Sequence, residues 1–292
     1  MILIGENINM MSQTIGPALK DRNPRPIQDL ARAETGSGVD YLDLNIGPAR
    51  KTGSELMPWV VNTVQEVTDL PLSLDTTNLA ATEAGLQTTR KTPLINSISL
   101  QPDRIGPGLE LAKKYDADVI ALLWGAEGMP RDANERAMNA VDFVYKANEI
   151  GIANEKLWID PIVSPLSVEI NQVTALVEFM AMLGEIAPGC KSVVGLSNIS
   201  NGTPTNLRPW LNRTYLMMLM KYGLHSAIVD AFDTDLIQIV RGKRPEILSL
   251  VHRIMDGETP DYASLSEEEA KYAKTVRVLT GKSLYSHSWL EI

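Results

Sequence analysis

The chain has 292 residues, of which 44% are hydrophobic, so it is long enough for one large α/β domain with a full core. Its formal net charge of -9 argues against nucleic acid or an anionic membrane surface as the main partner. The sequence has no apolar run long enough to span a bilayer, and its first residues lack the features of a signal peptide, so we expect a cytoplasmic protein.

Short apolar runs rich in Val, Ile and Leu alternate with longer segments of helical period along most of the chain. We expect strands at 2–8, 39–45, 71–75, 94–97, 117–124, 157–162, 192–198 and 227–230. Between them, Asn78 can cap a helix at 79–90, Asp132 can cap one at 133–150, and 168–186 is amphipathic. Eight such units predict a closed (β/α)₈ TIM barrel. An open doubly wound sheet is the alternative, but the first strand lacks the glycine-rich turn typical of that fold.

The sequence after about Gly242 predicts extra C-terminal helices. One helix is expected at Pro245–Met255, and Ser266 with Glu269 forms a capping box that opens a last helix. We therefore divide the chain into a barrel, residues 1–242, and a C-terminal helical extension, residues 243–292. The extension is expected to cover the barrel or to lie in a dimer interface.

Most of the expected strands end in an acid or an amide. These residues are Asn7, Asp43, Asn45, Asp75, Asn96, Asp160, Asn198 and Asp230. The carboxyl ends of barrel strands meet at one rim, where active sites lie. Asp and Asn also favour strand exits because they make turns and cap helices, which accounts for some of the set. It accounts poorly for Asp43 and Asp75, because an unpartnered buried carboxylate is costly.

The expected rim contains acids and amides but no histidine, because the three histidines lie late in the chain and away from strand ends. With one cysteine, no nucleophilic triad, metal site or phosphate-binding loop can be assembled. An Asp accepts two parallel hydrogen bonds from an amino and ring N–H edge, and an Asn donates and accepts at once. The rim therefore favours a flat, polar heterocycle as ligand, with no metal.

Seven segments in order carry a resemblance. They are Ile4-Gly5-Glu6-Asn7-Ile8-Asn9, Leu42-Asp43-Leu44-Asn45-Ile46-Gly47-Pro48, Leu74-Asp75-Thr76-Thr77-Asn78, Ile95-Asn96-Ser97, Trp158-Ile159-Asp160-Pro161, Val194-Gly195-Leu196-Ser197-Asn198-Ile199-Ser200 and Leu211-Asn212-Arg213-Thr214. From Met1 to about Gln238, the chain resembles the pterin-binding, dihydropteroate synthase-like family of (β/α)₈ barrels. Within it, the chain is most similar to the methyltetrahydrofolate:corrinoid protein methyltransferases.

The resemblance implies a site and a reaction. Asp75, Asn96 and Asp160 would hold the pterin ring, and Asn198 would lie beside its N5 atom. The wider binding set adds Asn201 and Arg208, in the loop after the seventh strand, and Asp43 and Asn7. The methyl group would move between N5 of tetrahydrofolate and the cobalt of a corrinoid. Hydrogen bonding would activate N5, with Asn198 and Asp160 as the catalytic residues.

The resemblance also implies partners. The sequence lacks the Asp-x-His-x-x-Gly loop of corrinoid-binding modules, so the corrinoid would come on a separate protein that docks over the rim. A homodimer is expected, and the long tail favours the relatives that serve O-demethylation. Two alternatives stay open. A dihydropteroate synthase-like condensing enzyme expels pyrophosphate and needs a cation where the seventh strand here offers an amide. A non-catalytic folate-binding protein would bind without turnover.

Overall fold

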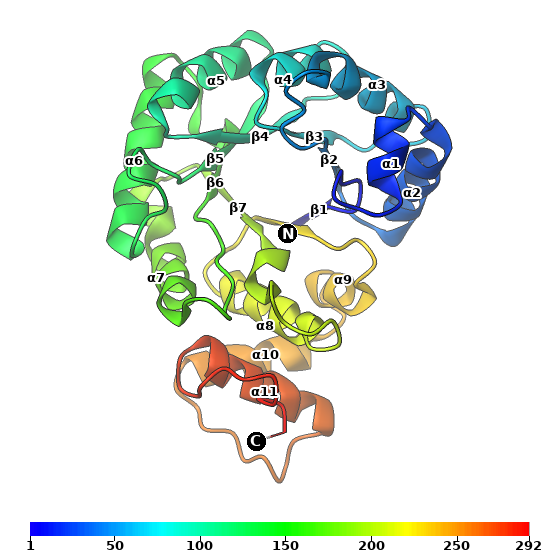
Figure 1. Cartoon of the computed structure of the whole chain (residues 1–292). Helices are drawn as coiled ribbons and strands as arrows, with labels where there is room; N and C mark the ends of the chain where they lie inside the picture. Colours follow the sequence, from blue (N-terminus) through cyan, green and yellow to red (C-terminus); the bar gives the residue numbers. More distant parts are fainter. Residues whose placement is uncertain (292) are drawn as a thin grey trace.

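The computed structural model describes residues 1–291 and contains a closed barrel of parallel strands (Figure 1). The strands are β1 (Ile2–Gly5), β2 (Tyr41–Asn45), β3 (Leu72–Asp75), β4 (Leu94–Ser99), β5 (Asp118–Leu122), β6 (Leu157–Asp160), β7 (Lys191–Gly195) and β8 (Ser226–Val229). They pair in chain order, and β8 closes the barrel on β1, where Ile228 lies beside Ile4. The predicted (β/α)₈ barrel is therefore confirmed.

Helices surround the strands, and their predicted caps are in place. They are α1 (Ile15–Lys20), α2 (Pro24–Ser37), α3 (Gly53–Gln65), α4 (Leu79–Leu86), α5 (Pro102–Lys114), α6 (Ala133–Glu149), α7 (Ile170–Ile186), α8 (Arg208–Met220) and α9 (Thr234–Val240), with short 3₁₀ turns η1 (Asn154–Lys156) and η2 (Leu196–Ser200). Asn78 accepts hydrogen bonds from the first turn of α4, and Asp132 does the same for α6. Each cap satisfies backbone N–H groups that a helix start leaves without partners.

Several predicted strand ends were wrong. β1 ends at Gly5 rather than at residue 8, and β7 ends at Gly195 rather than at Asn198. β5 and β6 each end two residues earlier than predicted, and β4 ends two residues later. After Gly195 the chain turns into η2, in which Leu196 and Ile199 remain buried. Because these apolar residues pack without pairing to a neighbouring strand, their pattern imitates the end of a strand. Asn198 therefore lies in a 3₁₀ turn.

The barrel interior has an apolar layer that forms a floor under the rim. Ile4, Leu94, Ile120, Trp158 and Val193 form a buried cluster inside the barrel, separate from the large core between strands and helices. Side chains alternate along a strand, so residues two positions further on also point inward. The next inward layer toward the carboxyl ends is thus the acid and amide layer that the sequence predicts.

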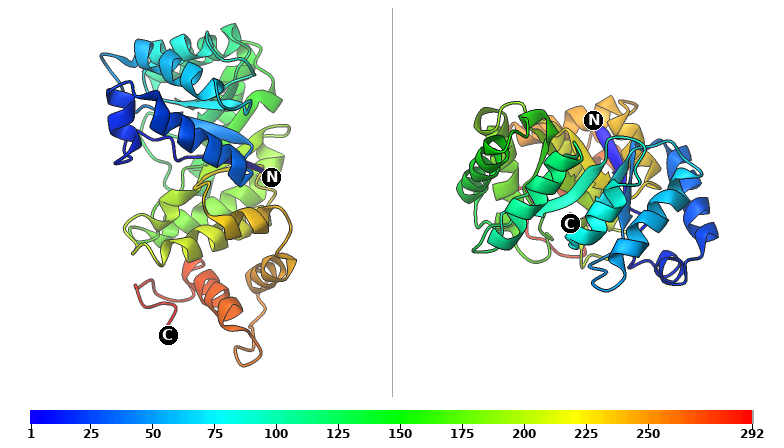
Figure 2. Two further views of the ribbon diagram at one scale, coloured as in Figure 1. Left: turned by 90° about the vertical axis from the view of Figure 1, so that its right-hand side faces the viewer. Right: turned by 90° about the horizontal axis from the view of Figure 1, so that it is seen from above.

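The C-terminal extension lies beside the barrel, against α8. It contains α10 (Pro245–Met255) and α11 (Glu267–Leu279), which opens with the predicted Ser266–Glu269 capping box. Both helices contact α8, at one end of the molecule (Figure 2). Residues 281–291, here called the C-terminal strap, then run back toward the rim, where the Tyr285 hydroxyl lies 2.6 Å from Oγ1 of Thr203. No helix within residues 1–291 is long and apolar enough to cross a membrane.

Candidate functional site

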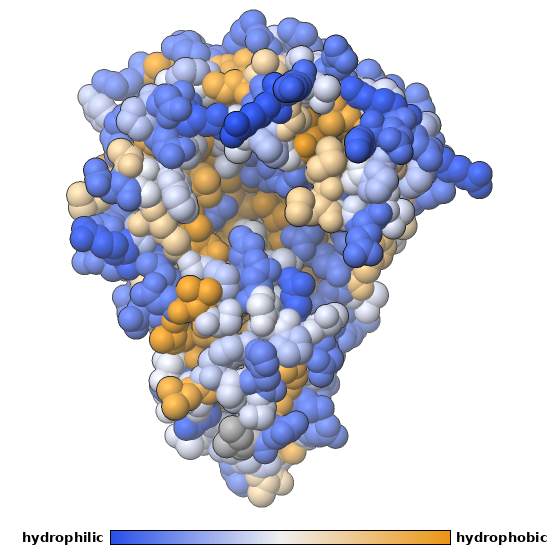
Figure 3. All heavy atoms as spheres, in the orientation of Figure 1, coloured by the Kyte–Doolittle hydropathy of each residue, from blue (hydrophilic) through white to orange (hydrophobic). Residues whose placement is uncertain are grey.

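The strand register brings three residues of the predicted rim together. Asn45 lies beside Asp75, and Asp75 lies beside Asn96, on the adjacent strands β2, β3 and β4. Across the barrel, Asp160 ends β6 beside Leu122. In the space-filling view this face is hollowed at its centre, with hydrophobic surface inside the hollow (Figure 3). The polar side chains therefore surround a concave opening with an apolar floor.

Amide groups and a hydroxyl hold the carboxylates of the first half of this rim. Ser73 donates to Oδ1 of Asp43 over 2.5 Å, and the Asn96 amide donates to the same oxygen over 3.0 Å. Asp75 accepts from the amide of Asn45. Each acid keeps further acceptor capacity, since an ionised carboxylate offers about four lone-pair sites. These acids can therefore bind N–H groups of a ligand while keeping their protein partners.

Burial raises the pKa of all three rim aspartates. It raises the pKa of Asp160 to about 6, and it holds the pKa of Asp43 and Asp75 above their ordinary range. The negative charge of Asp43 raises the pKa of Asp75 further. Within residues 1–291, none of the three forms an ion pair with a cationic side chain. Desolvated acids without cations are typical of functional sites, where a ligand supplies the missing donors.

The turn η2 and the loop behind it collect the late site residues. The side-chain amide of Asn201 donates to Oδ1 of Asn198 over 3.3 Å, so the NH₂ end of Asn198 is the end that can donate to a ligand. Nε of Arg208 donates to the Ser200 hydroxyl over 3.0 Å. The structure thus brings Asn198, Asn201 and Arg208 into one cluster.

Asn7 lies at the rim but uses both ends of its side chain within the protein. Its amide nitrogen donates to Asp230 over 2.8 Å, and its oxygen accepts from the backbone N–H of Ala231 over 2.9 Å. These contacts join the exit of β1 to the exit of β8. Its predicted role in substrate binding stays a prediction.

Two glutamates near the rim were missed. Glu6, which follows β1, accepts from the Ser197 hydroxyl over 2.5 Å, and burial raises its pKa. Glu34, on α2 behind β1, is fully buried, and burial raises its pKa to about 8. Its Oε1 accepts from the backbone N–H of Asn7 over 2.8 Å, while Oε2 has no partner within residues 1–291. Glu6 lies in one of the segments that carry the family resemblance, so the sequence could have identified it as a site residue. Glu34 lies in a helix outside these segments, so no such indication was present in the sequence.

A cavity of about 440 Å³ opens beside the exits of β3, β4 and β5. It is lined by Thr77, Ser97, Ser99, Gln101, Asp103, Arg104, Leu122 and Trp124. It adjoins Asp75 and Asn96 along the chain, so it extends the rim site on that side. A larger cavity lies in the C-terminal extension, between α11 and the C-terminal strap, and none of the predicted site residues lines it. Within residues 1–291, no group of His, Cys, Asp or Glu is placed to hold a metal ion.

Comparisons with known proteins agree with this geometry. The family model described as "Pterin binding enzyme" matches residues 11–230. The chain is 27% identical to the methylcorrinoid:tetrahydrofolate methyltransferase of Eubacterium limosum, over 81% of this chain and 88% of that protein. It is also 27% identical to methionine synthase of Mycobacterium tuberculosis, over 91% of this chain but only 23% of that protein.

The solved structures of dihydropteroate synthases have the same fold. The Yersinia pestis enzyme, in a sulfonamide drug complex, aligns with a TM-score of 0.65 at 15% identity, over 84% of this chain and 94% of that one. The Xanthomonas albilineans enzyme with 4-aminobenzoic acid gives a TM-score of 0.65 at 17% identity, over 84% of this chain and 92% of that one. Since the family model spans most of the barrel, the chain belongs to the pterin-binding enzyme family.

Proposed function

We propose that the protein transfers a methyl group between N5 of tetrahydrofolate and the cobalt of a corrinoid that a separate protein carries. The observation that carries the proposal is the set of desolvated rim carboxylates, Asp43, Asp75 and Asp160, which form no ion pair within residues 1–291, in a barrel of the pterin-binding enzyme family. The similarity to a methylcorrinoid:tetrahydrofolate methyltransferase over most of both chains supports the choice of reaction.

The pterin ring presents an edge of amino and ring N–H groups, which are donors, and the rim offers acceptors. Asp75 and Asp160 would accept from this edge, while Asn96, held by Asp43, would donate and accept. An ionised carboxylate that binds two such donors contributes strongly, because each hydrogen bond to a charged group is worth about 1.5–3 kcal/mol. Binding should therefore depend on both aspartates.

Methyl transfer from N5 needs help, because the departing nitrogen is a poor leaving group. The cobalt nucleophile takes the methyl carbon, the C–N5 electron pair stays on N5, and N5 gains a proton. Asn198 would donate a hydrogen bond that strengthens as charge develops on N5, and Asn201 orients it. In the reverse direction, N5 of tetrahydrofolate attacks the methyl carbon, the cobalt–carbon electron pair stays on cobalt, and N5 loses its proton.

Glu6 would hold the proton that enters or leaves N5. Its carboxyl group contacts Ser197, the residue before Asn198. Burial and the nearby charge of Asp230 raise the pKa of Glu6, so its protonated form survives to higher pH than that of an exposed glutamate. A carboxyl group whose pKa is raised is a better proton acceptor than an exposed glutamate and stays protonated to higher pH.

The contacts of the late arginine favour methyl transfer over pyrophosphate chemistry. Arg213 forms ion pairs with Asp233 over 2.7 Å and with Asp235 over 2.8 Å, so its charge is already neutralised. A dihydropteroate synthase-like reaction needs free cations at this end of the barrel to receive pyrophosphate. Beside η2, Arg208 is the cation that forms no ion pair within residues 1–291.

Exposed apolar side chains on the rim loops supply a docking surface for the corrinoid protein. Met11, Trp124, Val168 and Phe232 follow β1, β5, β6 and β8, and their exposed fractions are 88%, 38%, 77% and 46%. Large exposed apolar groups around a concave opening are typical of protein interfaces. The homodimer, the cytoplasmic location and the role in O-demethylation belong to the same proposal, and sedimentation of the purified protein tests the first of them.

The test is a methyl-transfer assay. Purified protein is mixed with 5-methyltetrahydrofolate and cob(I)alamin, and the cobalt oxidation state is followed by absorbance. We expect enzyme-dependent formation of methylcobalamin, slowed at least tenfold in Asn198→Ala, since a lost transition-state hydrogen bond costs about 1.4 kcal/mol or more. Asn62→Ala, at an exposed position of α3, is the matched control. Failure to bind tetrahydrofolate, or formation of dihydropteroate from a pterin pyrophosphate and 4-aminobenzoate, would overturn the proposal.

A further inference from the structure

A guanidinium group is buried behind the end of β6. Arg136 on α6 is fully buried, and within residues 1–291 it forms no ion pair with a carboxylate. Its donors go to neutral oxygens instead: Nε to the carbonyl of Pro161 over 2.8 Å, Nη2 to Oε1 of Gln172 over 2.7 Å, and Nη1 to the carbonyl of Asp132 over 3.3 Å. Burying a charge that no opposite charge neutralises is unfavourable. We therefore expect this arginine to have a function that offsets the cost of its burial.

One peptide group joins Arg136 to Asp160. The carbonyl of Pro161 accepts from Arg136, and the N–H on the other side of the same peptide, that of Ile162, donates to Oδ1 of Asp160 over 2.8 Å. A hydrogen bond to the oxygen of a peptide polarises the group and strengthens its N–H as a donor. Arg136 thus acts on the Asp160 carboxylate through a single rigid plane.

The turn that carries this peptide is strained. Ile162 has a φ of 67°, in the left-handed region that a β-branched residue rarely adopts. Such a conformation persists only where surrounding contacts hold it, and it is common at functional sites. The contact from Arg136 to the preceding carbonyl is one that holds it. Without that contact, the turn would relax and the Asp160 carboxylate would lose its fixed direction.

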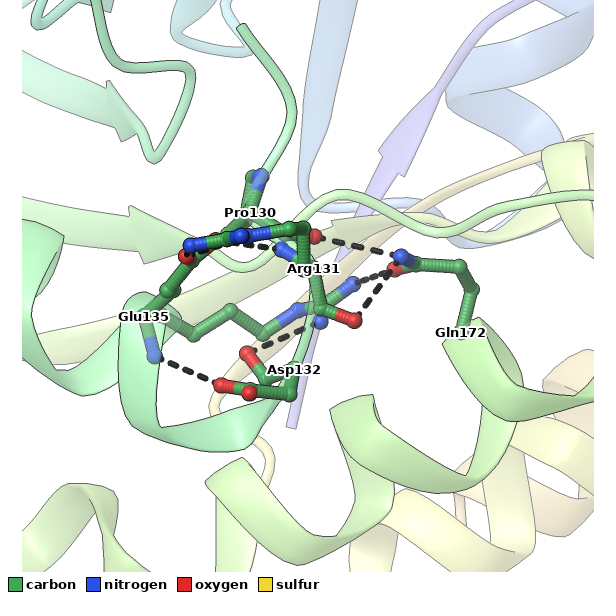
Figure 4. Close-up of polar contacts among 6 residues, drawn as sticks. Pro130, Arg131, Asp132, Glu135 and Gln172 are labelled. Carbon is green, nitrogen blue, oxygen red and sulfur yellow. Dashed lines mark hydrogen bonds and ion pairs between the residues drawn. The ribbon is translucent and has the colours of Figure 1, made fainter. Parts of the chain in front are cut away.

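Gln172 locks the guanidinium in place. Its side-chain amide, on α7, donates to the carbonyls of Pro130 over 3.2 Å and Arg131 over 3.1 Å, while its oxygen accepts from Arg136 (Figure 4). The close-up shows Gln172 reaching from α7 to the loop that leads into α6. The two helices that flank β6 therefore fix Arg136 from both sides.

We infer that Arg136 is a positioning residue for pterin binding, which orients the Asp160 carboxylate through the Pro161–Ile162 peptide and places a positive charge behind it. The inference rests on the proposed function, because it assigns Asp160 to the pterin ring. Arg136 would not contact the ligand itself, but it would determine how strongly Asp160 binds the pterin ring.

The charge also has an electrostatic consequence. Burial raises the pKa of Asp160 to about 6, and the charge of Arg136 acts in the opposite direction. Arg136 is the charged side chain that acts on Asp160. Asp132, at the N-cap of α6, and Tyr215, on α8, face Arg136. Removal of the Arg136 charge should therefore raise the pKa of Asp160 still further. The ionised form that accepts hydrogen bonds from the pterin would then be present only at higher pH.

The test measures tetrahydrofolate binding to the full chain from pH 5 to pH 8 by calorimetric titration. We expect Arg136→Met to weaken binding about tenfold at pH 7, which is the effect of losing one buried, charge-assisted contact. The midpoint of the pH profile of binding should also move to higher pH. Arg136→Lys keeps the charge and should restore the midpoint while leaving binding weaker. In an Asp160→Asn background, Arg136→Met should no longer move the midpoint.

The control is Tyr215→Phe, which removes the buried hydroxyl that donates to the Val173 carbonyl next to Gln172. It perturbs the same packing region without touching the Asp160 turn, and should leave affinity and midpoint unchanged. If Arg136→Met does not fold, Arg136→Lys and Gln172→Leu carry the test. A folded variant with the affinity and pH profile of the unmodified protein overturns the inference. An unmodified protein that does not bind tetrahydrofolate overturns the proposed function instead.

Discussion

Both ends of the barrel interior contain aspartates, but the partners of these aspartates differ between the two ends. At the amino end, Asp118 accepts from the indole N–H of Trp158 over 2.9 Å and pairs with Lys191 over 3.1 Å. At the carboxyl end, Asp43, Asp75 and Asp160 have amide, hydroxyl and backbone donors but no cation. An acid that is neutralised within the protein serves the fold, whereas an acid that is desolvated and left charged is available to a ligand.

The amino end is organised around one aromatic side chain. Trp158 makes edge contacts with the rings of Tyr41 and His225, at centroid distances of 5.7 and 5.1 Å. Lys191 lies 4.8 Å from its centroid. Burial, followed by the charge of Lys191, lowers the pKa of His225, which favours the neutral ring. Nδ1 of His225 has no partner within residues 1–291, but Asp118, Trp158 and Lys191 all pair with one another. This end therefore has the features of a structural closure of the barrel and lacks those of a site.

The largest effect that the comparison predicts is on ligand binding at the carboxyl end. Asp75→Asn should weaken tetrahydrofolate binding roughly a thousandfold, because two hydrogen bonds to a charged acceptor are worth about 4 kcal/mol together. The variant should fold at least as stably as the unmodified protein, since a desolvated charge is removed. Titration calorimetry and thermal unfolding measure the two effects.

Asp118→Asn is the matched control for this experiment. It should lower thermal stability, because Lys191 loses its partner, and it should leave tetrahydrofolate affinity unchanged. The opposite pattern, in which Asp118→Asn abolishes binding and Asp75→Asn does not, would show that the division between the two ends is wrong.

The next effect concerns Glu34, which extends the carboxyl-end pattern to a residue outside the barrel. Its pKa rises from 4.5 to about 8, so the folded protein binds a proton that the unfolded chain releases. Stability contributed by this proton is complete below pH 4.5 and is lost as the pH rises through about 8. Glu34→Gln keeps an acceptor for Asn7 without a charge, so it should be more stable by roughly 4 kcal/mol near pH 7.5.

The pH dependence of the stability difference distinguishes titration of Glu34 from a change in side-chain packing. Chemical unfolding of both proteins should give equal free energies near pH 4 and diverge as the pH increases. A stability difference that stays constant from pH 4 to pH 9 would mean that Glu34 is not titrating in the buried state.

The sequence was sufficient for the barrel and for most of the rim, and its failures have physical causes. Strands alternating with helical segments determine the topology. Asp75 and Asp160 end β3 and β6 because apolar runs stop there, whereas Asn96 lies inside β4, which continues to Ser99. The exit of β7 was misplaced, because η2 buries Leu196 and Ile199 as a strand would. Hydrophobic pattern alone does not separate a short buried turn from the end of a strand.

Buried charges on helices were the other failure. Glu34 and Arg136 stand in amphipathic segments, where a charged residue predicts an exposed face. Their burial depends on what packs against the helix: a side chain at Gly5 would approach the Glu34 carboxyl carbon to 3.3 Å, so the glycine creates the space for it. Such complementarity between distant segments is a property of the fold and leaves no trace in a local pattern.

A smaller effect is expected when the amino end loses its cation. Lys191→Met should lower the free energy of unfolding by about 1 kcal/mol, because the pair with Asp118 is partly exposed and Lys156 remains 3.8 Å away. Methyl transfer per folded molecule should not change. Denaturant unfolding and the methyl-transfer assay check both parts, and a variant with normal stability but impaired transfer would contradict the structural role.

The smallest effect tests whether the rim is also supported from outside the barrel. The C-terminal strap reaches the loop after η2 through the hydroxyl of Tyr285, which lies 2.6 Å from Oγ1 of the buried Thr203. Tyr285→Phe removes this hydrogen bond and keeps the ring, so stability should fall by at most about 1 kcal/mol. Hydrogen exchange should quicken at residues 201–207, which lead into the cluster of Asn201 and Arg208, while exchange at the amino end stays the same. The same loop orients Asn198. A modest slowing of methyl transfer with unchanged tetrahydrofolate affinity would therefore show that the strap acts on the reacting end of the ligand. An equal loss of transfer rate and affinity would show that it acts on binding of the pterin ring.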